Sequence, residues 1–339
     1  MDNCSHNGDK LRAAADAFAN AWTAKGLVDQ GFLHYLHDSS KVSFPWSMID
    51  KITPRPDARV EEMLNKDSIG GLEPIVTTKK TWVAPFVNAE ECQYLVIEDL
   101  FPNGKLPLDK EGIIYTDRAT VDKVEKMKVC TCLNPLHTTL AVYGCLMGYT
   151  LISDEMKDPL LKKFVEQVGY VEGLPVVVDP GILDPKKFID EVVNIRIPNP
   201  FMPDTPQRIA CDTSQKLPIR FGETIKAYAA SDSLNVKDLK FVPLVYAGWL
   251  RYLMAVDDEG SAFEPSPDPL LASSQEYVKG FALGNLPEDL SGLNALLSND
   301  KIFGVDLVAL GMSDLVLSYF RELAAGKGAV KATLTKYLG

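Results

Sequence analysis

Hydrophobic and polar positions in the first part of the chain predict one amphipathic helix followed by short strands. Hydrophobic residues recur at helical spacing along one stripe of 10–25, and Gly26 ends the pattern. The next stretch, 44–56, is bounded by prolines and is interpreted as irregular. From 73 to 117, short apolar runs alternate with turn residues, which is typical of strands. The expected strands are 75–77, 81–83, 94–97 and 113–115.

Beyond residue 134 the pattern predicts helices almost throughout. Four prolines follow a capping side chain, an arrangement that favours a helix start, and we expect helices of about ten to sixteen residues after each. The segment 136–149 is apolar nearly all round and contains small residues, so it should be a central helix that a neighbour approaches closely. The four helix starts are Asp158 with Pro159, Asp184 with Pro185, Thr205 with Pro206, and Asp268 with Pro269.

These elements together predict an α+β fold that is mainly α. A small β-containing first portion, 1–133, should be followed by a large all-α domain, 134–339. We find no solenoid-type repeat and no low-complexity linker dividing the chain.

Composition narrows the classes of function. The 339 residues include 46 acidic and 35 basic side chains, a net charge of −11, so nucleic acid is not an expected partner. No apolar run reaches the roughly 20 residues that span a bilayer. The best candidate, 241–256, is interrupted by Pro243 and Arg251, which predicts a buried helix. The polar start of the chain does not resemble a signal peptide, and we therefore expect a cytoplasmic protein without a membrane partner.

Cysteine and histidine are too sparse for a disulfide framework or an obvious metal centre. The chain has six cysteines and four histidines. Cys130, Cys132 and His137 form a local cluster, but no second ligand pair follows at a zinc-like spacing. We expect no metal, and interpret these thiols as packing groups.

Generic catalytic motifs are absent, but four polar clusters interrupt the apolar background. There is no strand followed by a Gly-rich dinucleotide turn, and no G-x-S-x-G nucleophile elbow. The clusters supply Lys, Asn, His, Arg and Asp, a set suited to polyhydroxy substrates because amides can donate to a developing alkoxide while cations hold hydroxyls or a carboxylate. The four clusters are 1–8, 48–54, 128–137 and 208–218.

The residues of these clusters, and the order of the clusters along the chain, resemble the sequence motifs of the polyol-specific long-chain dehydrogenases and reductases. That family contains mannitol 2-dehydrogenase, fructuronate reductase and tagaturonate reductase. Four sequence motifs of the family correspond to 2–8, 44–54, 128–137 and 208–218 of this chain. In order, they are D-N-x-x-x-N-G, F-P-x-x-M-V-D-R-I-T-P, K-x-R-x-L-N-x-x-H and R-x-x-x-D-x-S-x-K-L-P. The resemblance covers essentially the whole chain.

The resemblance implies metal-independent hydride transfer between NAD or NADP and a polyol or hexuronate. By motif position, Lys128 would be the general base that takes the alcohol proton. Asn3 and Asn134 would form an oxyanion-hole pair, and His137 would bind and orient a substrate hydroxyl. The resemblance also implies that 134–339 is the substrate domain, like the C-terminal domain of mannitol dehydrogenases.

Three further positions match residues that line the sugar pocket in that family. They are Asp50, Arg208 and Lys216, and the two cations could equally meet a uronate carboxylate. Whether the substrate is of the mannitol, fructuronate or tagaturonate type stays open, as do the cofactor-binding residues.

Each candidate also has a purely structural interpretation. Without the family motifs, Asn134 would be a helix cap, His137 a core histidine and Lys128 part of a solvated charged helix face. Arg208 and Lys216 would be surface charges, and Asp50 a turn residue.

Two departures from the family pattern bear on these roles. The family Lys stands five residues before the Asn, whereas Lys128 stands six before Asn134 with Val129 at the fifth position. We expect an extended segment whose bulge near 130–132 restores the direction of the Lys128 side chain. Lys126 is a second candidate for the general base.

The second departure is that the first family motif, 2–8, stands at the start of the chain. We therefore expect 1–133 to be the remnant of a nucleotide-binding domain, most of which is lacking. This leaves two rival functions, a non-catalytic fragment and a sugar-binding module that docks to a separate nucleotide-binding chain. An apolar face left by the lacking domain predicts self-association.

Overall fold

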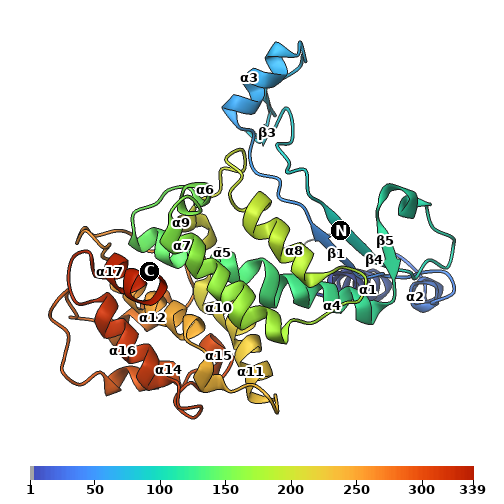
Figure 1. The fold of residues 1–339 in the computed structure, drawn as a ribbon. Coiled ribbons are helices and arrows are strands. Elements are labelled where there is room, and N and C mark those ends of the chain that lie inside the picture. Colours follow the sequence, from blue (N-terminus) through green and yellow to red (C-terminus); the bar gives the residue numbers. More distant parts are fainter. Residues whose placement is uncertain (1–3) are drawn as a thin grey trace. The chain divides into compact units, whose positions relative to one another are not determined.

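The computed structural model describes residues 4–339, and its contacts divide the chain into two compact units (Figure 1). Unit 1 runs to Ile52 and adds Glu90–Met127 and Val178–Asp184, while unit 2 contains Thr53–Ala89, Lys128–Val177 and Pro185–Gly339. The predicted boundary after residue 133 therefore differs from this division, which falls after Met127. That the first part is the remnant of a nucleotide-binding domain stays a prediction.

Unit 1 is built on a three-stranded sheet in the order β1–β4–β5. Strand β1 runs antiparallel to β4, and β4 runs parallel to β5. The strands expected at 94–97 and 113–115 are confirmed, but β1 lies in the stretch expected to be irregular. The elements of unit 1 are α1 (Asn7–Ala24), α2 (Gln30–His37), β1 (Ser47–Asp50), β4 (Tyr94–Glu98), the 3₁₀ turn Leu108–Glu111, β5 (Ile114–Thr116) and α4 (Arg118–Met127).

Residues of the first two family motifs, 2–8 and 44–54, contact each other within unit 1. The Asn7 side chain donates to the backbone oxygen and to Oγ of Ser47, both at 2.9 Å, and accepts from the Ser47 amide at 3.0 Å. A Cβ on Gly8 would lie 2.3 Å from the Phe44 oxygen, so only glycine fits there. The Asn-Gly pair of the first motif thus joins α1 to β1.

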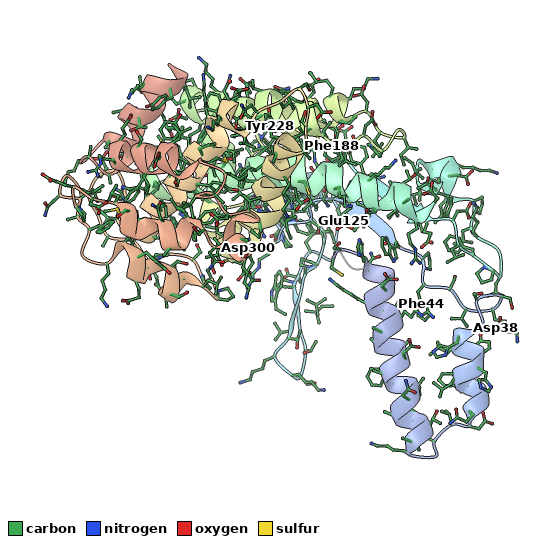
Figure 2. All side chains as sticks on the ribbon, turned by 90° about the horizontal axis from the view of Figure 1, so that it is seen from below. Asp38, Phe44, Glu125, Phe188, Tyr228 and Asp300 are labelled. Atoms are coloured by element: carbon green, nitrogen blue, oxygen red, sulfur yellow. The ribbon has the colours of Figure 1, made fainter. Side chains whose placement is uncertain are left out.

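Unit 2 is mainly helical, as predicted, with α5 at its centre. Helix α5 packs against α7, α9 and α12, and α12 packs along α16 (Figure 1). Phe188 and Tyr228, labelled in Figure 2, are among its buried side chains. The helices are α3 (Ala58–Lys66), α5 (Asn134–Leu146), α6 (Ile152–Glu155), α7 (Pro159–Glu166), α8 (Pro185–Glu191), α9 (Pro206–Ile209), α10 (Thr213–Leu217), α11 (Glu223–Ala229), α12 (Phe241–Leu253), α13 (Leu271–Gln275), α14 (Asn294–Leu297), α15 (Asp300–Phe303), α16 (Ser313–Leu323) and α17 (Ala329–Leu338).

Short non-α turns complete unit 2. π-Helical turns occupy Lys128–Cys132, Gln167–Gly173, Val192–Arg196 and Pro218–Gly222. The 3₁₀ turns are Leu174–Val176, Val236–Asp238, Glu276–Val278 and Ser291–Leu293, and a two-stranded hairpin pairs β2 (Ile75–Val76) with β3 (Trp82–Val83).

Three of the four proline-marked starts are confirmed, at α7, α8 and α9. The Asp158 carboxylate caps α7 by accepting from the Leu160 amide at 2.8 Å. At the fourth start, Asp268 Oδ1 accepts from the Leu270 amide at 2.9 Å, but a turn comes first and α13 begins two residues later than expected, at Leu271. The expected lengths hold at α7 and α8, which continue without a break into the π-helical turns 167–173 and 192–196, but not at α9, which has four residues.

The segment Thr53–Ala89, which carries α3 and the β2–β3 hairpin, belongs to unit 2 through contacts with one turn. Arg59 Nη2 donates to the Pro200 oxygen at 2.5 Å, and Asn88 Nδ2 donates to the Phe201 oxygen at 2.8 Å. The guanidinium of Arg59 also lies over the Phe201 ring.

The apolar stretch predicted at 241–256 is the buried helix α12. Its Arg251 is fully buried, and the guanidinium donates to the backbone oxygens of Leu323, Val256 and Asp257. Within residues 4–339, no helix is both long and apolar enough to cross a membrane.

Candidate active site

Lys128 lies at the start of unit 2 in a π-helical turn, Lys128–Cys132, that leads into α5. The Leu133 amide donates to the Lys128 oxygen at 3.0 Å, the five-residue step of a π turn. The expected extended segment with a bulge is therefore wrong. A π turn takes up one more residue than an α turn, which accounts for the six-residue separation of Lys128 and Asn134. Lys128 is only 5% exposed, so its interpretation as part of a solvated face is also wrong.

Asn134 and His137 lie in the first turn of α5, three residues apart and so on one helix face. The cap position belongs to Leu133, and no side chain caps this helix, so the interpretation of Asn134 as a cap is wrong. Within the described part of the chain, neither the Asn134 amide group nor the His137 ring has a hydrogen-bond partner. Both are therefore available to a ligand.

The surroundings of His137 keep its ring neutral at pH 7. The pKa of His137 is lowered to about 4, chiefly by burial and also by the nearby Arg220, Arg196 and Arg208, while Asp204 opposes this shift. A neutral imidazole has one donor and one acceptor nitrogen, so it can accept a hydrogen bond from a substrate hydroxyl. Because the ring lacks a partner among the described residues, His137 does not fit a satisfied core histidine.

Arg208 is the exposed member of an ion pair on α9. Its Nε donates to Asp204 Oδ1 at 2.5 Å, and its Nη2 donates to Oδ2 of the same carboxylate. This pairing raises the pKa of the Arg208 guanidinium. The Nε–Nη2 edge of Arg208 is therefore occupied, and the interpretation of Arg208 as a surface charge fits this geometry.

Lys216 of α10 holds the turn that precedes its own helix. Its Nζ donates to the backbone oxygens of Ile209, at 2.9 Å, and Cys211. Burial, followed by repulsion from Arg220, lowers the pKa of Lys216. Two of the three ammonium hydrogens are thus used within unit 2, leaving one for a ligand.

Arg220 is a site residue that the sequence reasoning missed. It lies in the π-helical turn Pro218–Gly222, and its Nη1 donates to Thr138 Oγ1 at 2.5 Å and approaches the Asn134 oxygen at 3.5 Å. Burial lowers the pKa of Arg220 to about 10. The available signal was its position two residues after the K-L-P of the fourth motif.

Glu155, on α6, was also missed. It is fully buried against α5, where a Cβ on Gly144 would lie 2.2 Å from Oε1. Neither carboxylate oxygen has a hydrogen-bond partner among the described residues. Burial and then Asp204 raise the pKa of Glu155 well above its usual value, which favours the protonated carboxyl.

Asp50 belongs to unit 1 of the fold. Asp50 is 4% exposed in β1 of unit 1 and pairs across the sheet with Tyr94, so its interpretation as a turn residue is wrong. Asn3 lies outside the described residues. The substrate role of Asp50 and the oxyanion role of Asn3 stay predictions.

No metal cluster occurs in the part of the chain that the structure describes. Cys132, in the cluster considered from the sequence, is buried with Sγ 3.7 Å from the Pro185 oxygen, and burial raises the pKa of its thiol to about 12. A protonated thiol of this kind is a poor metal ligand.

The β5–α4 junction does not fit a dinucleotide phosphate site. Strand β5 leads into α4 through Asp117, whose carboxylate accepts from the Thr120 amide at 3.0 Å. A carboxylate at this helix start opposes a pyrophosphate, which needs open amides and close approach by glycine. We therefore assign no pyrophosphate contact to this junction.

Comparison with known proteins identifies relatives of the whole described region. Residues 120–315 match the family described as mannitol dehydrogenase C-terminal domain. A D-mannonate oxidoreductase of Thermotoga maritima is 52% identical over 341 residues, which cover 100% of this chain and 63% of the relative.

Two solved structures share the fold. Pseudomonas fluorescens mannitol 2-dehydrogenase, in a ternary complex with NAD and D-mannitol, is 28% identical with a TM-score of 0.67, covering 100% of this chain and 61% of that one. A substrate-free D-sorbitol dehydrogenase is 25% identical with a TM-score of 0.73, covering 97% and 61%. The chain thus spans about three fifths of the length of these proteins.

Proposed function

Because the chain belongs to the mannitol dehydrogenase family, we propose that it binds the substrate and moves the proton in an NAD-dependent oxidoreductase. The observation that carries this proposal is the junction before α5. There, buried Lys128 precedes Asn134 and His137, and neither of these two polar side chains has a partner among the described residues. The combination of an amine, an amide and a neutral imidazole suits oxidation of a secondary alcohol.

In this proposal each residue acts on the substrate. Lys128 Nζ takes the proton of the reacting hydroxyl, and the Asn134 amide donates to the oxygen as it becomes a carbonyl. His137 accepts a hydrogen bond from a substrate hydroxyl and fixes its orientation. NAD, when bound, supplies the hydride acceptor, so the alcohol loses one proton and one hydride and becomes a ketone.

The electrostatic surroundings of His137 favour a sugar acid over a neutral polyol as the substrate. Three arginines lower the pKa of His137, and Asp204 is the acid that raises it. A positive surrounding of this kind attracts a carboxylate. The name of the Thermotoga maritima relative, D-mannonate oxidoreductase, supports the same substrate class. We therefore propose D-mannonate, or a closely related sugar acid, as the substrate.

The Lys128→Ala variant tests the proposal. Removal of the general base should lower NAD-dependent oxidation of D-mannonate by about 10²–10⁴-fold. The matched control is Lys126→Ala, which removes an exposed lysine paired with Asp122 and should change the rate less than tenfold. A loss below tenfold in the Lys128 variant, or an equal loss in both variants, would refute the assignment. The measurement is the steady-state rate of NAD-dependent D-mannonate oxidation, in a preparation whose unmodified protein shows this activity.

A second candidate is a sugar-binding module that works with a separate nucleotide-binding chain. Asp117, which links β5 to α4, favours this alternative, because its carboxylate makes this junction unsuited to a phosphate. Fluorescence titration with NADH separates the two. Binding by the chain alone supports the self-sufficient enzyme, whereas binding only after addition of a nucleotide-binding partner supports the module.

A further inference from the structure

Arg220 presents one unoccupied edge of its guanidinium beside the start of α5. Its two hydrogen bonds, to Thr138 Oγ1 and towards the Asn134 oxygen, both use Nη1. Within the described residues, Nε and Nη2 make no hydrogen bond. These two nitrogens form the parallel pair of donors that matches the two oxygens of a carboxylate.

Arg208 provides a direct comparison within the same unit. Its Nε and Nη2 both donate to Asp204, so its corresponding edge is already filled by a carboxylate of the protein. The two arginines therefore differ in the one property that matters for binding an acid. Sequence position alone favoured Arg208, whereas the hydrogen bonds favour Arg220.

Arg220 also lacks a counter-ion. No carboxylate of the described residues lies within ion-pair distance of it, and burial is the dominant influence on its charge. A partly buried cation without an acid partner is unfavourable unless a ligand neutralises it. The position of Arg220 therefore indicates an anionic ligand group.

We propose that the Nε–Nη2 edge of Arg220 binds the carboxylate of a sugar-acid substrate and thereby selects acids over neutral polyols. This proposal rests on the proposed function, since it assigns one end of that substrate. Arg220 Nη1 lies 3.5 Å from the backbone oxygen of Asn134, so the guanidinium lies beside the turn of α5 that carries Asn134 and His137. Arg220 would then fix which carbon of the substrate reaches Lys128.

The Arg220→Gln variant tests the proposal, because glutamine keeps a donor for Thr138 Oγ1 but loses the charge and the two-nitrogen edge. Calorimetric titration should show D-mannonate binding weakened by at least about tenfold, while D-mannitol binding changes less than twofold. The matched control is Lys226→Gln, which removes an exposed cation paired with Glu223 and should leave both affinities unchanged. An Arg220→Lys variant, which keeps the charge, should recover only part of the loss.

The outcomes separate this proposal from the proposed function. If Arg220→Gln binds D-mannonate as tightly as the unmodified chain, or loses D-mannitol equally, the carboxylate assignment is wrong even if the active form still oxidises D-mannonate. If D-mannonate binding depends on Arg220 but no active form transfers hydride from it, the assignment stands and the proposed oxidoreductase function fails. Thermal melting of each variant shows whether the fold is retained.

Discussion

Glu155 shows how strongly a single buried group depends on its neighbours. Its carboxyl fills the space left by Gly144, and its oxygens have no hydrogen-bond partner among the described residues. Its pKa is raised, so the folded chain holds a proton that the unfolded chain releases above about pH 4.5. The contribution of this group to stability is therefore lost as pH rises from about 4.5 towards the folded pKa.

The Glu155→Gln variant should remove this pH dependence. We expect the variant to gain at least about 1 kcal/mol of unfolding free energy relative to the unmodified chain when pH rises from 5 to 8. Urea titrations of both proteins at the two pH values provide the measurement. Parallel behaviour of the two proteins would show that Glu155 does not titrate in this range.

Single residues also show how far residue type alone can identify the residues of the candidate site. Asn134 and His137 were selected by their positions in the third family motif, because residue type alone left them open as a helix cap and a core histidine. Arg220 and Arg208 are chemically identical, however, and only the hydrogen bonds of the folded chain show which guanidinium edge Asp204 fills. The i, i+4 spacing of Asp204 and Arg208 allows such a pair, but the sequence does not show that the pair forms.

At the scale of elements, one buried acid connects a π turn to a central helix. Glu172 lies in the turn Gln167–Gly173, and its oxygens accept from the amides of Lys240, Phe241 and Val242 at 2.5–2.8 Å. These amides begin α12 and would otherwise be buried without partners. Glu172 therefore caps α12 from a distant part of the sequence.

The Glu172→Ala variant should be strongly destabilised because three amides lose their acceptor. We expect a loss of about 2–4 kcal/mol in the free energy of unfolding, and a smaller loss for Glu172→Gln, which keeps one oxygen. Glu223→Ala is the control, since Glu223 is exposed and pairs only with Lys226 in the hydrogen bonds and ion pairs of the described chain, and it should change stability by less than about 0.5 kcal/mol. Urea denaturation measures all three, and a Glu172→Ala loss no larger than that of the control would contradict the capping role.

The π-helical turns explain why element boundaries were predicted less well than element types. Three of these turns carry Lys128, Arg196 and Arg220. A π turn differs from an α turn by a single residue per hydrogen-bonded ring, and the hydrophobic pattern is nearly the same for both. The sequence therefore indicated a spacing change before Asn134, but not the helical form that absorbs it.

At the scale of the whole molecule, exposed apolar side chains gather in Thr53–Ala89. Seven of the large hydrophobic side chains exposed among the described residues belong to this segment, and the β2–β3 hairpin exposes every one of its strand residues. An apolar surface of this kind tends to associate. The seven residues are Met63, Ile69, Ile75, Val76, Trp82, Val83 and Val87.

We therefore expect the isolated chain to self-associate and to bind an apolar dye. Replacing Ile75 and Trp82 together by threonine, which retains β propensity, should reduce both properties because these side chains are 64% and 51% exposed. Sedimentation velocity and dye fluorescence measure the effect. A clean monomer without dye binding in the unmodified chain would contradict this expectation.

The sequence by itself determined the mainly helical fold, most of the short strands and the family, because these depend on local periodicity, helix caps and the order of the family motifs. It also selected Lys128, Asn134 and His137, which are close in the chain. Only the tertiary structure decided which arginine keeps an unoccupied edge, which acid caps α12 and which carboxyl is buried at Gly144. Those properties arise from contacts that form on folding, either nearby in the chain, as for Asp204 and Arg208, or between distant segments, as for Glu172 and α12. Burial and hydrogen bonding then set the charge and availability of each group.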